Sequence, residues 1–299
     1  MIRQDELSQS QSQSQGRVAA ERPAIGVQIG IRPGTIGGYV ILGLLALIYL
    51  IPLLFVLFVS LMSSRQFSLN AASFPDPIMW SNYPEAWVKG SFSTYFVNTL
   101  VYTFVIVLGT LIIATLAAFP IARAHVRGSN FFYVFFLSGI LLPAGIIPQF
   151  FVMQQLGIYD TRQGYILLWL SRVALPIFII TGFIKSIPSE LDDAAAIDGC
   201  SYIRYILQVV VPLIRPALSV VGLIIAIRVW NDIIGPVIFL PSNSIKPISA
   251  GLLQFFAEFA AQWTLIAAAI AITASPLVLL YLFTQRYIIA GMTSGALKG

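Results

Sequence analysis

Charged side chains are scarce in this chain. Of its 299 residues only 10% are Asp, Glu, Lys or Arg, whereas 58% are hydrophobic, and the mean hydropathy is +0.87. This composition provides too little polar surface to cover a soluble globule of the same length, so lipid must form part of the surroundings. The sequence therefore indicates a membrane protein.

Several chemical groups are also nearly or wholly missing. The single cysteine, Cys200, excludes an internal disulfide, and the single histidine, His125, leaves no cluster of soft metal ligands. No G-x-x-x-x-G-K-[ST] phosphate loop occurs, so the chain is not expected to hydrolyse ATP by itself. The 17 basic residues are scattered between apolar runs rather than gathered on one face, which argues against a nucleic-acid partner.

Six hydrophobic stretches are each long enough to cross a bilayer, which takes about 20 mostly apolar residues. We expect these spans at residues 37–62, 95–122, 131–154, 164–184, 217–240 and 263–284. The more polar segments 63–94 and 241–262 are long enough to carry short helices at the membrane surface. The sequence thus predicts an all-α integral membrane protein with six transmembrane helices, of which the last five form a core over 95–284.

The two ends of the chain are expected on the same side of the membrane. Residues 1–36 are polar, with a Ser/Gln repeat, and are predicted to be a mostly disordered tail; 285–299 form a second tail. If the N-terminus is inside, that side receives eleven Lys and Arg residues and the other side four. The positive-inside rule then places both termini in the cytoplasm.

The loop 186–216, between the fourth and fifth spans, is then cytoplasmic and carries an unusual number of carboxylates. Ser189 is predicted to cap a short helix, with Asp192 completing a capping box and Gly199 ending the helix. Carboxylates in the first turn suit the positive end of the helix dipole and could meet basic groups on a partner, and small side chains on one face would let another surface approach closely. The predicted docking residues are Glu190, Asp192, Asp193, Ala194, Ala195, Asp198 and Gly199.

A second helix in this loop is predicted over 201–210 from apolar residues at helical spacing. Pro212 and Pro216 are expected to end it, because proline breaks a helix interior. Two short helices that meet at a glycine would form a bent, rigid plug. An ordinary polar connection is the alternative, although consistent caps and a small-residue face favour docking.

This loop resembles the EAA loop of ATP-binding-cassette (ABC) importer permeases. The run D-A-A-A-I-D-G at 193–199, with V-P-L following at 211–213, is similar to the family pattern E-A-A-x-x-D-G with a later L-P; Asp193 stands where the family usually has Glu. The resemblance covers roughly residues 80–299 and is closest to the maltose-type carbohydrate branch. Further matching pieces are Asn82-Tyr83, Asn98-Thr99, Leu156-Gly157, Trp230-Asn231-Asp232 with Pro236, and the tail Gly295-Ala296-Leu297-Lys298-Gly299.

The resemblance implies a set of partners. In that family the loop around Gly199 and Pro212 would lie in a cleft of a cytoplasmic ATPase dimer, which binds ATP and Mg itself. An external solute-binding protein would deliver a sugar or oligosaccharide, and a second, usually different permease subunit would complete the pore in the inner membrane of a prokaryote. The tail residues implied to make a second ATPase contact are Gly295, Ala296, Lys298 and Gly299.

Ionisable residues at bilayer depth suggest a translocation path, because each costs roughly 2.5–3.5 kcal/mol to insert and normally faces a cavity or a partner. Arg228 and Asp232 have the i,i+4 spacing of one helical face, and Arg172 lies in the middle of the fourth span. We expect these three, with Trp230 and Asn231, to line the path. Mutual neutralisation of Arg228 and Asp232, or fastening of two permease subunits, remains an equal alternative.

The sequence therefore predicts a non-catalytic permease subunit that is coupled through the Gly199 loop to a separate ATPase. The main alternative is a secondary carrier driven by an ion gradient, with Asp232 as its ion site. That alternative explains Asp232 but not the acidic loop. An integral-membrane enzyme is a third class, for which one histidine and one cysteine in separate loops offer little catalytic chemistry.

Overall fold

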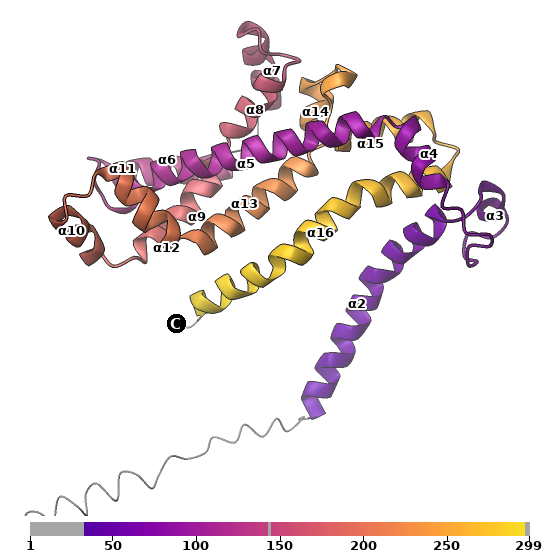
Figure 1. The fold of residues 1–299 in the computed structure, drawn as a ribbon, viewed down its shortest axis with the longest axis horizontal. Helices are drawn as coiled ribbons and strands as arrows, with labels where there is room; N and C mark the ends of the chain where they lie inside the picture. The colour runs from indigo at the N-terminus through magenta and orange to yellow at the C-terminus, as the bar shows by residue number, and fades with distance from the viewer. Residues whose placement is uncertain (1–32, 143–144, 297–299) are drawn as a thin grey trace, which may run out of the picture. The chain divides into compact units, whose positions relative to one another are not determined.

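A computed structural model describes residues 33–142 and 145–296, and every regular element in these ranges is helical (Figure 1). The elements are α2 (Pro33–Ser60), α3 (Ser64–Leu69), α4 (Asn82–Lys89), α5 (Phe92–Ala122), α6 (Ser129–Leu141), α7 (Ile146–Gln155), α8 (Arg162–Leu170), α9 (Ala174–Lys185), α10 (Glu190–Ile197), α11 (Tyr202–Tyr205), the π-helix η1 (Ile206–Val210), α12 (Val211–Leu213), α13 (Arg215–Trp230), α14 (Ile234–Phe239), the 3₁₀ helix η2 (Asn243–Ile245), α15 (Ile248–Glu258) and α16 (Trp263–Ala296). The predicted all-α class is confirmed.

Three helical stretches in the described chain are long and apolar enough to cross a membrane alone: Gly37–Ser60, Phe92–Ala122 and Trp263–Phe283. Three further candidates are bent pairs, which reach the required length only when two helices are taken together. These pairs are α6 with α7, α8 with α9 (bent by 45°), and Tyr202–Leu213 with α13 (bent by 81°). Counting each pair as one span gives up to six, which agrees with the number predicted from hydropathy.

The helix boundaries depart from the predicted ones at both ends. The first helix begins at Pro33, inside the predicted tail 1–36, whose residues 1–32 lie outside the described chain. The last helix continues to Ala296, twelve residues past the predicted end at 284. The stretch 284–290 contains neither Gly nor Pro, so nothing local stops the helix there.

The fourth span breaks at residues 171–173, before Pro176. Pro176 lies in the first turn of α9, where a residue without an amide hydrogen is tolerated. The predicted span 217–240 is also interrupted, because α13 ends at Trp230 and α14 begins at Ile234.

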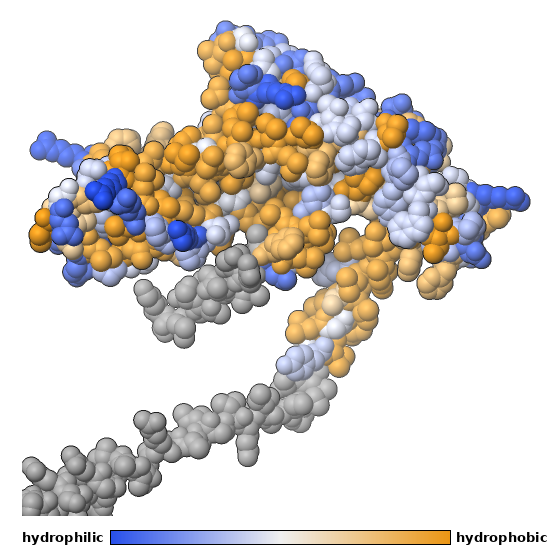
Figure 2. All heavy atoms as spheres, in the orientation of Figure 1, coloured by the Kyte–Doolittle hydropathy of each residue, from blue (hydrophilic) through white to orange (hydrophobic). Residues whose placement is uncertain are grey.

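The helix α5 is the centre of the main core and packs against α9 and α13 (Figure 1). Buried side chains of these helices, together with residues of α8 and α11, form one cluster that includes Tyr102, Tyr165, Ile180, Tyr205 and Val221. Figure 2 shows hydrophobic residues over the middle of the surface formed by these packed helices and hydrophilic residues around α10 and α11. The chain divides into two units, Met1–Pro52 and Leu53–Gly299, and the sites described below all lie in the second.

Candidate coupling and translocation sites

The predicted docking helix, α10, begins without a side-chain cap. Ser189 has helical backbone angles, and its side chain makes no capping hydrogen bond, so the predicted capping box with Asp192 is wrong. The carboxylate of Asp192 interacts instead with a basic residue from another helix. Glu190, Asp192 and Asp193 do occupy the first turn, where the helix dipole favours negative charge.

Gly199 ends α10 in the manner predicted. Its φ of +67° lies in the left-handed region, which glycine enters without steric cost. The amide of Gly199 donates to the carbonyl of Ala196 at 3.1 Å, and the amide of Cys200 donates to the carbonyl of Ala195 at 2.9 Å. These two bonds make a Schellman motif, which satisfies carbonyls at the helix end and turns the chain sharply.

Most of the predicted docking set faces outward. Its exposed members are Glu190, Asp193, Ala194, Asp198 and Gly199. Asp192 and Ala195 are partly buried and face the rest of the chain. Ile197, which the sequence reasoning did not single out, is 86% exposed beside these groups. The outward face of α10 thus combines carboxylates and small side chains with one large apolar side chain.

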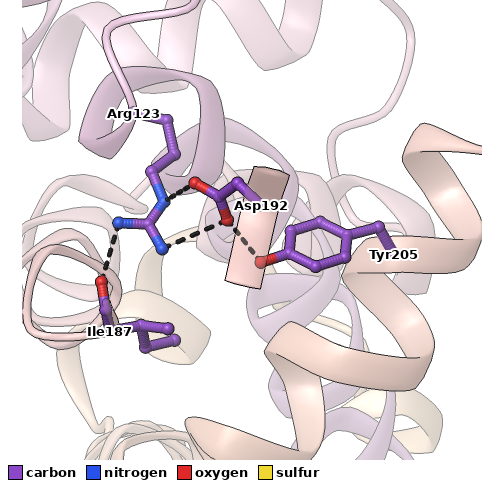
Figure 3. Close-up of polar contacts among 4 residues, drawn as sticks. All are labelled: Arg123, Ile187, Asp192 and Tyr205. Atoms are coloured by element: carbon purple, nitrogen blue, oxygen red, sulfur yellow. Dashed lines mark hydrogen bonds and ion pairs between the residues drawn. The ribbon is translucent and has the colours of Figure 1, made fainter. Parts of the chain in front are cut away.

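Asp192 connects the loop to the end of α5 (Figure 3). Its Oδ2 lies 2.7 Å from Nε of Arg123, and Nη2 of Arg123 donates to Oδ1 at 3.2 Å. Nη1 of Arg123 donates to the carbonyl of Ile187 at 2.9 Å, and the hydroxyl of Tyr205 donates to Oδ1 of Asp192. The Arg123 side chain is only 9% exposed and that of Asp192 20%. This is a partly buried ion pair with additional hydrogen bonds on both partners.

The second loop helix does not end at Pro212. The helix predicted over 201–210 consists of α11 followed by the π-turn Ile206–Val210, and it continues through Pro212 to the bend at Ile214. The amide of Val211 bonds to the carbonyl of Ile206, five residues back. Pro212 lies at the start of α12, where its missing amide hydrogen is tolerated.

Asp232 lies in the break between α13 and α14 and receives three hydrogen bonds. The Tyr165 hydroxyl (2.9 Å) and the Trp169 indole Nε1 (3.2 Å) donate to Oδ2, and the Gly235 amide donates to Oδ1 at 3.0 Å. The Ser249 hydroxyl donates to the Asp232 carbonyl at 2.6 Å. Asp232 is thus a junction between helices α8, α14 and α15.

Arg228 and Asp232 do not share a helical face. The helix α13 ends at Trp230, and Asn231, whose side-chain amide donates to the Ile227 carbonyl at 2.9 Å, caps it. Within the described residues Arg228 forms no ion pair with Asp232. Arg228 and Asn231 are both exposed, so the alternative in which Arg228 and Asp232 neutralise each other does not occur in this structure.

The remaining predicted path residues are packed against aromatic rings. The guanidinium carbon of Arg172 lies 5.0 Å from the ring centre of Trp169, in the break between α8 and α9. Trp230 is 7% exposed; its Nε1 donates to the Thr273 carbonyl at 3.1 Å, and its ring meets Phe96 edge-on. Trp230 is thus a core residue in this structure.

The predicted second contact at the C-terminus is only partly described. Gly295 and Ala296 form the last turn of α16. Lys298 and Gly299 lie outside the described residues.

Comparison with known proteins identifies the family. The chain is 30% identical over 264 residues to YurM of Bacillus subtilis, a probable ABC transporter permease protein, and the match covers 87% of each chain. It is 31% identical over 262 residues to MelC of the same organism, a melibiose/raffinose/stachyose import permease protein, covering 86% of this chain and 94% of the relative. The chain belongs to the carbohydrate-uptake family of ABC importer permeases.

The permease fold also occurs in a solved structure. A chain from the crystal structure of a bacterial ABC transporter involved in the import of the acidic polysaccharide alginate superposes with a TM-score of 0.79 at 27% identity. The match covers 86% of this permease and 97% of that chain. A scan against protein-family models finds no match.

The permease therefore carries two candidate sites, one at the loop after α9 and one at the break after α13. Sequence reasoning pointed to α10 and Asp232 but did not identify the residues that hold them, namely Arg123, Ile187, Tyr205, Tyr165, Trp169 and Ser249. For Arg123 the signals were its position directly after the apolar run of α5 and the resemblance of the segment from Leu116 to Arg123 to the permease family. The tyrosines gave none, because their partners are distant in sequence.

Proposed function

We propose that this permease is a non-catalytic membrane subunit of an ATP-driven importer and forms half of the translocation path for a sugar or oligosaccharide. The observation that carries the proposal is the exposed, acidic and small-residue surface of α10, closed by the left-handed Gly199. The names of the relatives support the substrate class, since MelC imports melibiose, raffinose and stachyose.

The proposed assembly has four kinds of component. A cytoplasmic ATPase dimer binds ATP and Mg and receives the α10 loop, and the C-terminal tail makes a second contact with it. A second, non-identical permease subunit completes the pore, and an external binding protein delivers the sugar. The excess of basic residues on one side supports a cytoplasmic location for both termini and the loop.

The path-lining role is proposed for the exposed polar residues at the breaks in the spans. Arg228 and Asn231 are exposed at the end of α13, and Arg172 lies at the break before α9. Guanidinium and amide groups are suited to hydrogen bonding with sugar hydroxyls. Asp232 and Trp230 then shape the path indirectly by holding the break in place, since both are already bonded within the chain.

A secondary carrier that uses Asp232 as its ion site is the weaker proposal. An ion-carrying carboxylate must exchange its ligands during each cycle, whereas Asp232 already receives bonds from Tyr165, Trp169 and Gly235. The carrier also gives no role to the exposed face of α10.

Purification of the complex through this subunit tests the proposal. We expect an ATPase, a second permease and a binding protein to co-purify, and one saccharide from a panel to stimulate ATP hydrolysis in the presence of the binding protein. Uptake that continues without cytoplasmic ATP while an ion gradient is maintained would favour the carrier instead.

A further inference from the structure

The end of α5 is fastened to the coupling loop by side chains. The helix α5 is unbroken over 31 residues, about 46 Å at 1.5 Å per residue, and Arg123 is the first residue after it. A single helix thus extends across the thickness of a membrane to the loop proposed to dock on the ATPase.

Arg123 holds the loop at two points. Its guanidinium donates to the Ile187 carbonyl, in the connection before α10, and pairs with both carboxylate oxygens of Asp192, inside α10. The planar fork of arginine fixes the direction of such contacts as well as their strength. The start of α10 therefore has little freedom to rotate relative to the end of α5.

Tyr205 closes the network from the far side of the loop. It is 6% exposed, and its hydroxyl donates to the same Asp192 oxygen that accepts from Arg123. Its ring also packs edge-on against Phe119, in the last turn of α5. One carboxylate thus joins α10 and the nearby α11 to α5, although Arg123 and Asp192 are 69 residues apart in sequence.

The groups in this network are distinct from the exposed docking face. Asp193, Ile197 and Asp198 are exposed, whereas Arg123 and Tyr205 are not. Docking and the internal attachment can therefore be altered separately.

We propose that Arg123, Asp192 and Tyr205 are positioning residues that make α10 and α5 move as one body, so that closure of the ATPase is transmitted to the second span as well as to the spans that flank the loop. This inference rests on the proposed coupling function. Without the network, α10 remains docked and follows the ATPase, but α5 lags behind.

Distance measurement tests this directly. In a Cys200→Ser background, spin labels are placed at Val126, exposed just beyond α5, and at Ser189, exposed just before α10. In the assembled complex the distance should stay constant between the nucleotide-free and ATP-bound states, and Asp192→Asn should broaden or shift it between states. A distance that changes with nucleotide in the parent protein would overturn the proposal.

Activity in liposomes with the binding protein gives the second readout. We expect Arg123→Gln, which removes the ion pair with Asp192, and Tyr205→Phe to retain the ATPase subunits and their hydrolysis rate, while sugar transported per ATP falls roughly tenfold, within the range of typical coupling free energies. Arg204→Ala is the matched control, because Arg204 is an exposed arginine of the same loop whose only hydrogen bond among the described residues is to Gln208.

The outcomes separate the two proposals. The Tyr205→Phe variant preserves the packed ring. If it nevertheless loses the ATPase subunits and sugar uptake together, these residues serve docking, and the transmission role is overturned. Unchanged transport per ATP in both variants would overturn it as well. If the parent complex contains no ATPase, the coupling function itself fails, whatever the distances show.

Discussion

Trp169 and Asp232 are hydrogen-bonded across the breaks of two different spans. The indole Nε1 of Trp169, near the end of α8, donates to the carboxylate in the interruption after α13 at 3.2 Å. Breaks free backbone groups that the membrane interior cannot satisfy, so they persist only where other protein groups stabilise them. Two irregular segments in this permease therefore stabilise each other.

Asp232→Asn should impair uptake without preventing assembly. The amide keeps an acceptor oxygen but loses the negative charge, which weakens the bonds from Tyr165 and Trp169; hydrogen bonds to charged groups contribute about 1.5–3 kcal/mol each. Sugar uptake and co-purification of the partner subunits should be measured together. Trp169→Phe, which removes one donor, should show a smaller defect in the same direction. Intact uptake in Asp232→Asn would contradict a functional role for this junction.

Arg228→Ala should lower uptake at limiting sugar concentration. If the exposed guanidinium contacts the substrate, losing one charge-assisted hydrogen bond of about 1.5–3 kcal/mol lowers kcat/KM roughly tenfold to a hundredfold. Arg228→Lys should retain more activity, and Arg65→Ala, which alters an exposed arginine on α3, should have no effect. If Arg228→Ala instead loses the second permease subunit, and those complexes that still contain it transport sugar normally, Arg228 lies at a subunit interface.

The spans were predictable because hydropathy and length are the properties that the bilayer requires. A run such as 95–122 needs no tertiary partner to be helical in lipid, and α5 occupies almost the same residues. The breaks were not predictable in this way. The interruption at 231–233 depends on Tyr165 and Ser249, which a local pattern does not reveal.

In the loop 186–216, too, local features were predictable from the sequence and tertiary contacts were not. Gly199 was predictable, since a helix stop is a local event at which a left-handed residue is needed. The absence of the capping box at Ser189 was not predictable, because Asp192 pairs with Arg123, which is 69 residues away in sequence. An ion pair with several hydrogen bonds contributes more than a single cap, so the tertiary contact prevails.

Ile197→Asp should release the ATPase. The Ile197 side chain is 86% exposed, and its burial against the ATPase would stabilise the complex by about 1.5–3 kcal/mol. A carboxylate at this position would lose that contribution and add the cost of burying a charge. Co-purification of the ATPase with the permease is the measurement. Leu69→Asp is the control, because Leu69 is 79% exposed on α3, outside the loop. ATPase binding that survives Ile197→Asp at parental strength would exclude Ile197 from the docking surface.

Gly199→Ala should weaken docking through backbone strain alone. Nothing lies within 4 Å of a Cβ built at Gly199, so the cost is that of holding an L-residue at φ +67°, about 1–2 kcal/mol. Gly157 has a φ of +66° and equally open surroundings after α7, so Gly157→Ala should cost similar stability in a thermal melt. Only the change at Gly199 should reduce ATPase co-purification and transport per ATP, and Gly199→Asn should restore part of both, because Asn tolerates the left-handed region. Equal effects of the two alanine variants on ATPase binding would mean that stability, and not the shape of the loop, governs docking.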